Sequence, residues 1–147
     1  MIIDVRGLPA PQGSKRHVGG GRMVEQSKAV GPWREAVRAE TQRGMDKADR
    51  LGIGPYTGPV QVKLEFRMTR PKSHYRTGRN AALLRNGAPG RPAGKPDLDK
   101  LARAVLDGLT AGGAWKDDSQ VVVLMAEKLY AAVPGCRIIV TDLEGEQ

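Results

Sequence analysis

The sequence predicts a single α+β domain, residues 1–147, in which helices cover a mixed or antiparallel sheet as a second layer. Three observations lead to this prediction. Residues 60–68 alternate strictly between apolar and polar side chains, which is typical of a half-buried strand. Residues 98–109 repeat apolar side chains at the spacing of an amphipathic helix. Two apolar runs at 120–130 and 136–141 close the chain, so the expected order is β-α-β-long loop-α-β-β.

The first strand and the first helix are expected in the N-terminal third. Residues 2–8 alternate loosely and end before Pro9, which favours a strand. Residues 9–16 then predict a loop, and the glycines at 19–21 predict a turn. Ser27 is a suitable N-cap for a helix that runs to about Arg43. The residues expected on its buried face are Val30, Trp33, Val37 and Met45.

The second helix and the last two strands are expected in the C-terminal third. Gly112 and Gly113 end the helical pattern. The apolar runs that follow predict a hairpin that turns at 133–135. The apolar run at 121–124 is compatible with a central strand of the sheet. The apolar residues of the helix are Leu98, Leu101, Ala102, Val105, Leu106 and Leu109.

Positive charge is concentrated in one segment of the chain. The sequence has 24 Lys and Arg against 16 Asp and Glu, a net charge of +8. Eight of these cations lie between Phe66 and Pro96, where there is no acidic residue. Residues 69–96 are also rich in Pro and Gly, which predicts a long and mobile loop. A local basic segment favours a polyanionic partner such as nucleic acid.

Several classes of protein are disfavoured by the composition. Cys136 is the single cysteine, which excludes an internal disulfide and a zinc site built from several cysteines. The N-terminus lacks the pattern of a signal peptide, and no apolar run approaches membrane-spanning length. A soluble, cytoplasmic protein is therefore expected.

Acidic residues cluster at both ends of the second helix. Asp97 and Asp99 lie at its start, and Asp117 and Asp118 follow its end. If 121–124 forms a central strand, these carboxylates are expected to converge, and such clusters bind hard ions such as Mg²⁺. Each also has a structural alternative, namely an N-cap, an ion pair within the helix, or a turn. Together with the basic segment, they favour a metal-dependent enzyme that acts on phosphate backbones.

Two further residues lie on the same side of that helix as Asp99. Arg103 and Asp107 follow it at i+4 and i+8, so the three side chains form one stripe. Asp107 fits equally well as a solvated helix residue or as a support for a metal site.

Four segments of the sequence resemble the RusA-type Holliday junction resolvases. They read GLPAPQGSKR at 7–16, RPKSHY at 70–75, KPDLDKLARAVLDGL at 95–109 and DDSQVV at 117–122. The resemblance implies that Asp97, Asp99 and Asp118 are catalytic carboxylates that bind Mg²⁺, with Mn²⁺ as an alternative ion. It also implies a functional lysine at the position of Arg103. Arginine keeps the positive charge but cannot readily release a proton.

The activity implied by this resemblance is the resolution of Holliday junctions by paired symmetric cuts, in DNA recombination and repair. The family acts as a homodimer and is often encoded by phages or prophages. A nuclease for other branched DNA, such as flaps or forks, and a non-catalytic DNA-binding module are the alternatives. The residues expected to contact DNA phosphates are Lys15, Arg16, Lys72, Arg76, Arg79, Arg85, Arg91 and Lys95.

Overall fold

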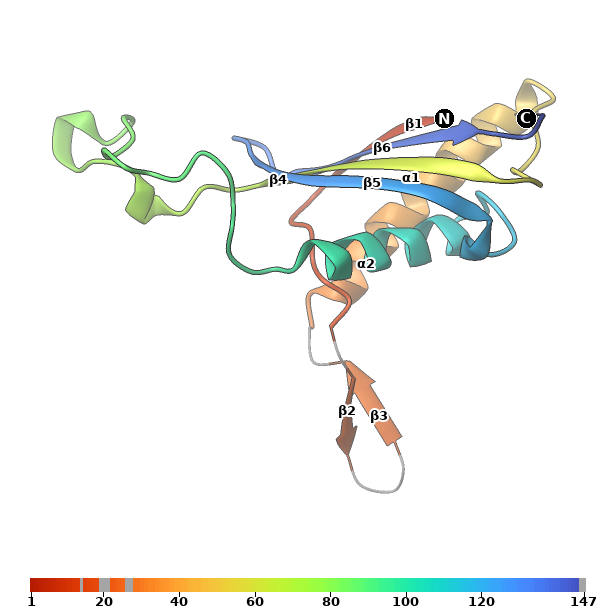
Figure 1. Ribbon diagram of the computed structural model, residues 1–147, viewed down its shortest axis with the longest axis horizontal. Helices are drawn as coiled ribbons and strands as arrows, with labels where there is room; N and C mark the ends of the chain where they lie inside the picture. Colours follow the sequence, from red (N-terminus) through yellow and green to blue (C-terminus); the bar gives the residue numbers. More distant parts are fainter. Residues whose placement is uncertain (14, 19–21, 26–27, 146–147) are drawn as a thin grey trace.

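A four-stranded mixed sheet forms one layer of the protein and two helices form the other (Figure 1). The computed structural model describes residues 1–13, 15–18, 22–25 and 28–145. The strand order is β1-β6-β4-β5, with β5 parallel to β4 and the other neighbours antiparallel. The predicted α+β class is therefore confirmed. The bounds are β1 Ile2–Arg6, α1 Val30–Arg50, β4 Val60–Met68, α2 Leu98–Ala111, β5 Val121–Tyr130 and β6 Gly135–Asp142.

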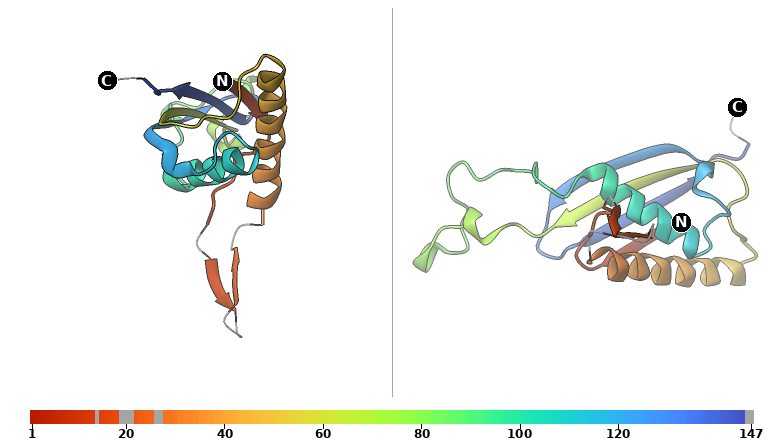
Figure 2. Two further views of the ribbon diagram at one scale, coloured as in Figure 1. Left: turned by 90° about the vertical axis from the view of Figure 1, so that its right-hand side faces the viewer. Right: turned by 90° about the horizontal axis from the view of Figure 1, so that it is seen from below.

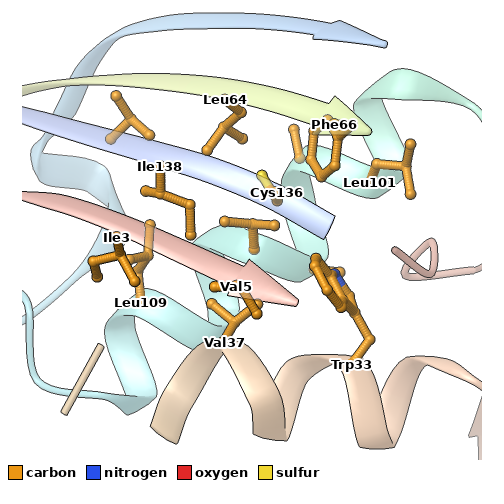
Figure 3. Close-up of a cluster of buried hydrophobic side chains, with 14 of the residues drawn as sticks. Ile3, Val5, Trp33, Val37, Leu64, Phe66, Leu101, Leu109, Cys136 and Ile138 are labelled. Carbon is orange, nitrogen blue, oxygen red and sulfur yellow. The ribbon is translucent and has the colours of Figure 1, made fainter. Parts of the chain in front are cut away.

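The core lies between the sheet and the two helices (Figure 3). The alternation in β4 is realised, because all five of its apolar residues are buried and the residues between them are more exposed. From α1, Trp33 and Val37 enter the same core, and from α2 Leu101 and Leu109 do so. The two tryptophans serve packing, since Trp115 is buried as well and donates a hydrogen bond to Thr110 Oγ1 at 2.8 Å.

The predicted hairpin between the last two strands is wrong. β5 and β6 do not pair with each other, because β4 lies between them and pairs with both. The connecting residues 131–134 pass across the end of β4, where the amide of Ala131 donates to the carbonyl of Met68 at 3.0 Å. β5 is consequently an edge strand, so the condition that 121–124 forms a central strand is not met.

Helix α1 differs from its prediction at both ends. It begins at Val30 with Ala29 at the N-cap position and has no side-chain cap. The predicted cap, Ser27, lies outside the described residues. The helix continues to Arg50 rather than ending near Arg43. Thr41, which the pattern did not place in the core, is buried because its hydroxyl donates to the carbonyl of Val37 at 2.7 Å.

A second, two-stranded sheet interrupts the segment predicted as a loop. β2 (Lys15–Val18) pairs antiparallel with β3 (Arg22–Glu25). Figures 1 and 2 show that this hairpin extends away from the body of the domain. It contains no run of alternating apolar residues in the sequence, so the strand pattern gave no signal there.

Residues 69–96 form a second projection, which we call the basic arm (Figure 2). Two short helical turns, Lys72–His74 and Gly78–Asn80, lie within it. Its two limbs are joined by backbone hydrogen bonds from Arg76 to Leu83 and from Arg85 to His74, both 2.8 Å. No helix in the described ranges is long and apolar enough to cross a membrane.

Candidate catalytic carboxylates and nucleic-acid interface

Asp97 and Asp99 lie where the basic arm returns to the body of the domain. Asp97 occupies the N-cap position of α2 but makes no side-chain cap hydrogen bond. Its carboxylate lies 3.5 Å from the ammonium of Lys100, and both side chains are partly exposed. Asp99 follows in the first turn, where the partial positive charge of the helix N-terminus favours a carboxylate. Asp97 therefore shares its charge with Lys100 but is not used as a cap, and the side chains of Asp97 and Asp99 are both exposed to solvent.

Asp118 lies at the other end of α2, in the loop that leads into β5. A capping box holds this loop, because the Asp117 carboxylate accepts from the amide of Ser119 at 2.8 Å. The Gln120 side chain closes the box and donates to the carbonyls of Tyr56 and Gly58, each at 3.0 Å. Asp117 is thus tied to the turn, whereas the side chain of Asp118 is left to face solvent.

A cleft of about 670 Å³ surrounds Asp118. It lies between α1 and α2, and its ionisable lining residues are Arg34, Glu35, Arg38, Asp107, Asp117 and Asp118. Partial burial raises the pKa of Asp118, and the negative charges of Asp117 and Asp107 raise it further. Hydrogen bonds from Ser119 instead lower the pKa of Asp117. A carboxylate disfavoured by its neighbours in this way gains most from a cationic ligand.

The three predicted catalytic carboxylates do not converge within one chain. Asp97 and Asp99 lie at the start of α2, whose 14 residues span about 21 Å at the usual helical rise, whereas Asp118 lines the cleft with Asp107 and Ala111 of its second half. Figure 1 shows α2 beginning beside the base of the basic arm and ending beside the loop before β5. Among the described residues, no three His, Cys, Asp or Glu side chains are close enough to share a metal ion. The expected convergence failed because β5 is an edge strand and returns along the helix instead of crossing its start.

Arg103 and Asp107 connect the two ends of the helix along its exposed side. The prediction that Asp99, Arg103 and Asp107 lie along one side of the helix is confirmed, because all three belong to one regular helix. No ion pair joins Asp99 to Arg103 within the described part of the chain, so the alternative of a simple helical pair does not apply. Asp107 is half-buried and lines the cleft with Asp118. Arg103 is exposed, with its guanidinium available to a phosphate.

Some cations of the basic arm make contacts within the protein, and others extend into solvent. Arg76 donates to the carbonyl of Leu84 and to Asn86, and Arg85 donates to the carbonyl of Tyr75, so both hold the arm together. Arg91 pairs with Glu127 at 3.2 Å. The arm cations that make no hydrogen bond or ion pair through their side chains, within the described ranges, are Lys72, Arg79 and Lys95.

Residues of β5 fasten the base of the arm. The Arg70 guanidinium lies 4.2 Å from the ring centroid of Tyr130 and donates to the carbonyl of Pro89 at 2.6 Å. The edge of His74 meets the same tyrosine ring, with centroids 5.7 Å apart. The Lys128 ammonium donates to the carbonyls of Gly94 at 2.7 Å and Pro96 at 2.9 Å. The start of α2 is thereby fixed beside the far end of β5.

The remaining predicted DNA contacts lie on the projecting hairpin. Lys15 and Arg16 belong to β2. Sequence reasoning also missed a structural connection between this region and the helices. The amide of Gln12 donates to the carbonyl of Lys100 at 3.0 Å, and Arg34 donates to the Gln12 side chain at 2.9 Å. The segment before the hairpin is therefore anchored to both helices.

The sequence is similar to known proteins over most of its length. The sequence model of the family described as endodeoxyribonuclease RusA matches residues 5–141. An uncharacterised protein of Bacillus subtilis (strain 168), YqaN, is 32% identical over 87 residues. These residues make up 59% of this chain and 60% of the relative, so less than two-thirds of that protein is covered.

Proposed function

Because the chain belongs to the RusA endodeoxyribonuclease family, we propose that it is a Mg²⁺-dependent endonuclease that resolves four-way DNA junctions by paired symmetric cuts. The observation that carries this proposal is the position of Asp97 and Asp99, which lie at the base of an arm that bears seven cations and no acid. Cations on the arm attract the phosphate backbone, and the carboxylates provide oxygen ligands where that backbone meets the domain.

Shape rather than base sequence is expected to guide binding to the junction. The basic arm and the β2–β3 hairpin project from the body in different directions (Figure 1). Lys72, Arg79 and Lys95 are suited to contact phosphates, because no other group within the described ranges engages their side chains. Arg76 and Arg85 are expected to contribute indirectly by holding the arm in shape.

A homodimer is the second part of the proposal, and β5 is its expected interface. β5 is an edge strand, so one side of its backbone is unpaired by the sheet. Four successive apolar residues near its start are exposed, namely Val122, Val123, Leu124 and Met125 at 60%, 38%, 46% and 49%. Because successive residues point to opposite faces, apolar side chains flank the open edge on both sides. A second copy that pairs with this edge would cover both faces at once.

Such a dimer would also assemble the carboxylates. Two β5 strands related by a two-fold axis run antiparallel, so the start of one lies beside the end of the other. Asp118 lies just before the start of β5, and Asp97 is fixed beside its end through the contact of Lys128 with Pro96. Pairing would therefore bring Asp118 of one chain toward Asp97 and Asp99 of the other. Each dimer would then hold two sites, as paired cutting requires.

The chemistry follows from the side chains that meet there. Asp97, Asp99 and Asp118 would hold Mg²⁺, which supplies Lewis-acid polarisation of the phosphate and a more acidic water. Arg103 lies one helical turn after Asp99 and can stabilise the extra negative charge that develops on the phosphate oxygens in the pentacoordinate transition state. Arginine stays protonated, so Arg103 is expected to act through its charge and not by proton transfer.

The activity is tested with a labelled synthetic four-way junction beside a linear duplex and a flap, each with Mg²⁺ or EDTA. Resolution predicts paired, symmetric, Mg²⁺-dependent nicks in the junction, and loss of cleavage but not of binding in Asp97→Asn. Cleavage of flaps in preference to junctions would move the substrate to other branched DNA. Binding without cleavage by the wild type, with either Mg²⁺ or Mn²⁺, would leave a DNA-binding module.

The shared site is tested separately by mixing two inactive variants. Asp97→Asn and Asp118→Asn homodimers should both be inactive. If each site combines Asp97 of one chain with Asp118 of the other, the mixed dimer has one intact site and nicks a single strand. If each site lies within one chain, both sites of the mixed dimer are damaged and no activity returns. Co-expression with two different tags supplies the mixed dimer, and each variant co-expressed with itself is the control.

A further inference from the structure

A second cleft lies directly beside the Asp97 end of α2, and apart from Asp97 and Lys95 its lining residues have no role in the mechanism above. It has a volume of about 600 Å³, within the range of sites that bind small organic groups. The cleft lies between the segment 8–13 and the residues that lead into α2. The hydrogen bond from Gln12 to the carbonyl of Lys100 holds these two segments together, so the cleft is built into the fold.

The walls and the mouth of this cleft differ in chemistry. Leu8, Pro9, Met68 and Pro96 contribute apolar walls. Lys95, Asp97 and Lys100 contribute charged groups to the same lining. A ligand that suits both must combine a flat or compact apolar part with an anionic part. A nucleotide has this composition, because its base is largely apolar on its faces and its phosphate is negative.

We propose that this cleft receives an unstacked nucleobase next to the phosphate that is cut. The inference rests on the proposed function, and it assigns the cleft as the source of any sequence preference in cleavage. A base pair at a branch point can lack a stacked neighbour on one side, so extruding a base there loses fewer stacking contacts than in a continuous duplex. Asp97 belongs both to the cleft and to the carboxylate set, so a base held in the cleft brings its own phosphate to the reacting position.

Substitution of Leu8 tests the role of the cleft directly. Its side chain is 63% exposed although it lines the cavity, so it stands at the opening rather than in the core. Leu8→Asn keeps the size of the side chain and makes that part of the wall polar. Leu51→Asn is the matched control, because Leu51 is also exposed, at 71%, and does not line the cleft.

The first experiment observes the base itself, in EDTA so that cleavage does not interfere. Junctions that carry 2-aminopurine at single positions around the branch point are bound to the wild type and to both leucine variants. We expect the fluorescence of 2-aminopurine to rise on binding at one position, because the base unstacks there. Leu8→Asn should reduce this rise, and Leu51→Asn should leave it unchanged. An equal response at all positions, or equal behaviour of the two variants, would overturn it.

The second experiment measures cleavage of junctions with one abasic site at each position in turn. Loss of the base that enters the cleft should slow cleavage at least about fivefold, since stacking of one base contributes roughly that much or more. Leu8→Asn should show a similar loss on the intact junction and little further loss with the abasic site. If Leu8→Asn changed only the oligomeric state, the cleft would be a contact between chains and the inference would fail.

The two proposals fail in different ways. If the fluorescence response depends on Leu8 but the protein cuts no branched DNA, the proposed nuclease activity is refuted and the base-binding cleft is supported. If paired cleavage occurs but neither an abasic site nor Leu8→Asn changes its rate, the nuclease activity is supported and the cleft is refuted as a base-binding site.

Discussion

Helices α1 and α2 approach each other closely at Gly108, so a substitution there is predicted to lower the stability of the fold. A Cβ atom on Gly108 would lie 2.6 Å from Val37 Cγ1, 2.8 Å from Val37 Cβ and 3.2 Å from the carbonyl oxygen of Arg34. The Cβ and carbonyl positions are fixed by the backbone of α1, so no change of rotamer relieves these contacts. Gly108→Ala must therefore move the helices apart.

The magnitude is set by two opposing effects. Overpacking of this kind costs about 1–3 kcal/mol, and replacing glycine by alanine in a helix recovers up to about 1 kcal/mol. We expect Gly108→Ala to lose about 1–2 kcal/mol. Gly31→Ala lies in the first turn of α1, where nothing is within 4 Å of the added Cβ, so only the favourable effect remains. That variant should gain up to about 1 kcal/mol.

The assay is urea denaturation of the wild type and the two variants at one protein concentration, because the stability of the proposed dimer would depend on concentration. The corresponding shifts in Tm are about 2–4 °C per kcal/mol for a chain of this size. Gly108→Ala should also weaken cleavage, since Arg34 and Asp107 line the two sides of the Asp118 cleft. Equal or greater stability of Gly108→Ala than of the wild type would refute the packing argument.

Three further predictions concern the sheet and the base of the arm. A hydrogen bond from Arg137 lowers the pKa of Asp4, so their pairing stabilises the fold at neutral pH and is lost as the pH falls through that lowered pKa. Asp4→Asn should therefore reduce the free energy of unfolding at pH 7 and have no effect in strong acid, measured by urea denaturation at each pH. Burial raises the pKa of Cys136 to about 12, so the native thiol should resist a thiol reagent at pH 8 and react fully in denaturant. Arg70→Ala removes the cation from the ring of Tyr130 and should speed limited proteolysis within 71–90, with unchanged cleavage elsewhere in the chain.

Local periodicity predicted the elements well where one pattern dominated. The alternation from Val60 to Met68 gave β4 with its bounds, and the helical spacing gave α2 to within two residues at its end. Both patterns report which face of an element is buried, and the core is built from those faces. The β2–β3 hairpin was missed because its short strands, KRHV and RMVE, have no alternation of apolar and polar residues in the sequence.

Neighbour relations were harder to predict than the elements. A short connection around Pro134 made a hairpin of the last two strands the natural expectation, since sequential strands are usually neighbours. The actual order depends on β4, which pairs along both of its edges and so separates β5 from β6. The residues 120–141 alone do not indicate that β5 and β6 each pair with β4 instead of with each other, because β4 lies about 60 positions earlier in the chain.

The separation of the carboxylates, in contrast, was available from the sequence. A helix that starts at Asp97 and ends at Gly112 carries the chain about 20 Å away from its start. Only six residues lead from Gly112 to Asp118, and fully extended they span about 20 Å. Any turn in them leaves Asp118 short of Asp97, and the capping box at Asp117 is such a turn. If these carboxylates share a metal ion as we propose, their separation within the chain points to a second chain, and the exposed apolar edge of β5 is where that chain would bind.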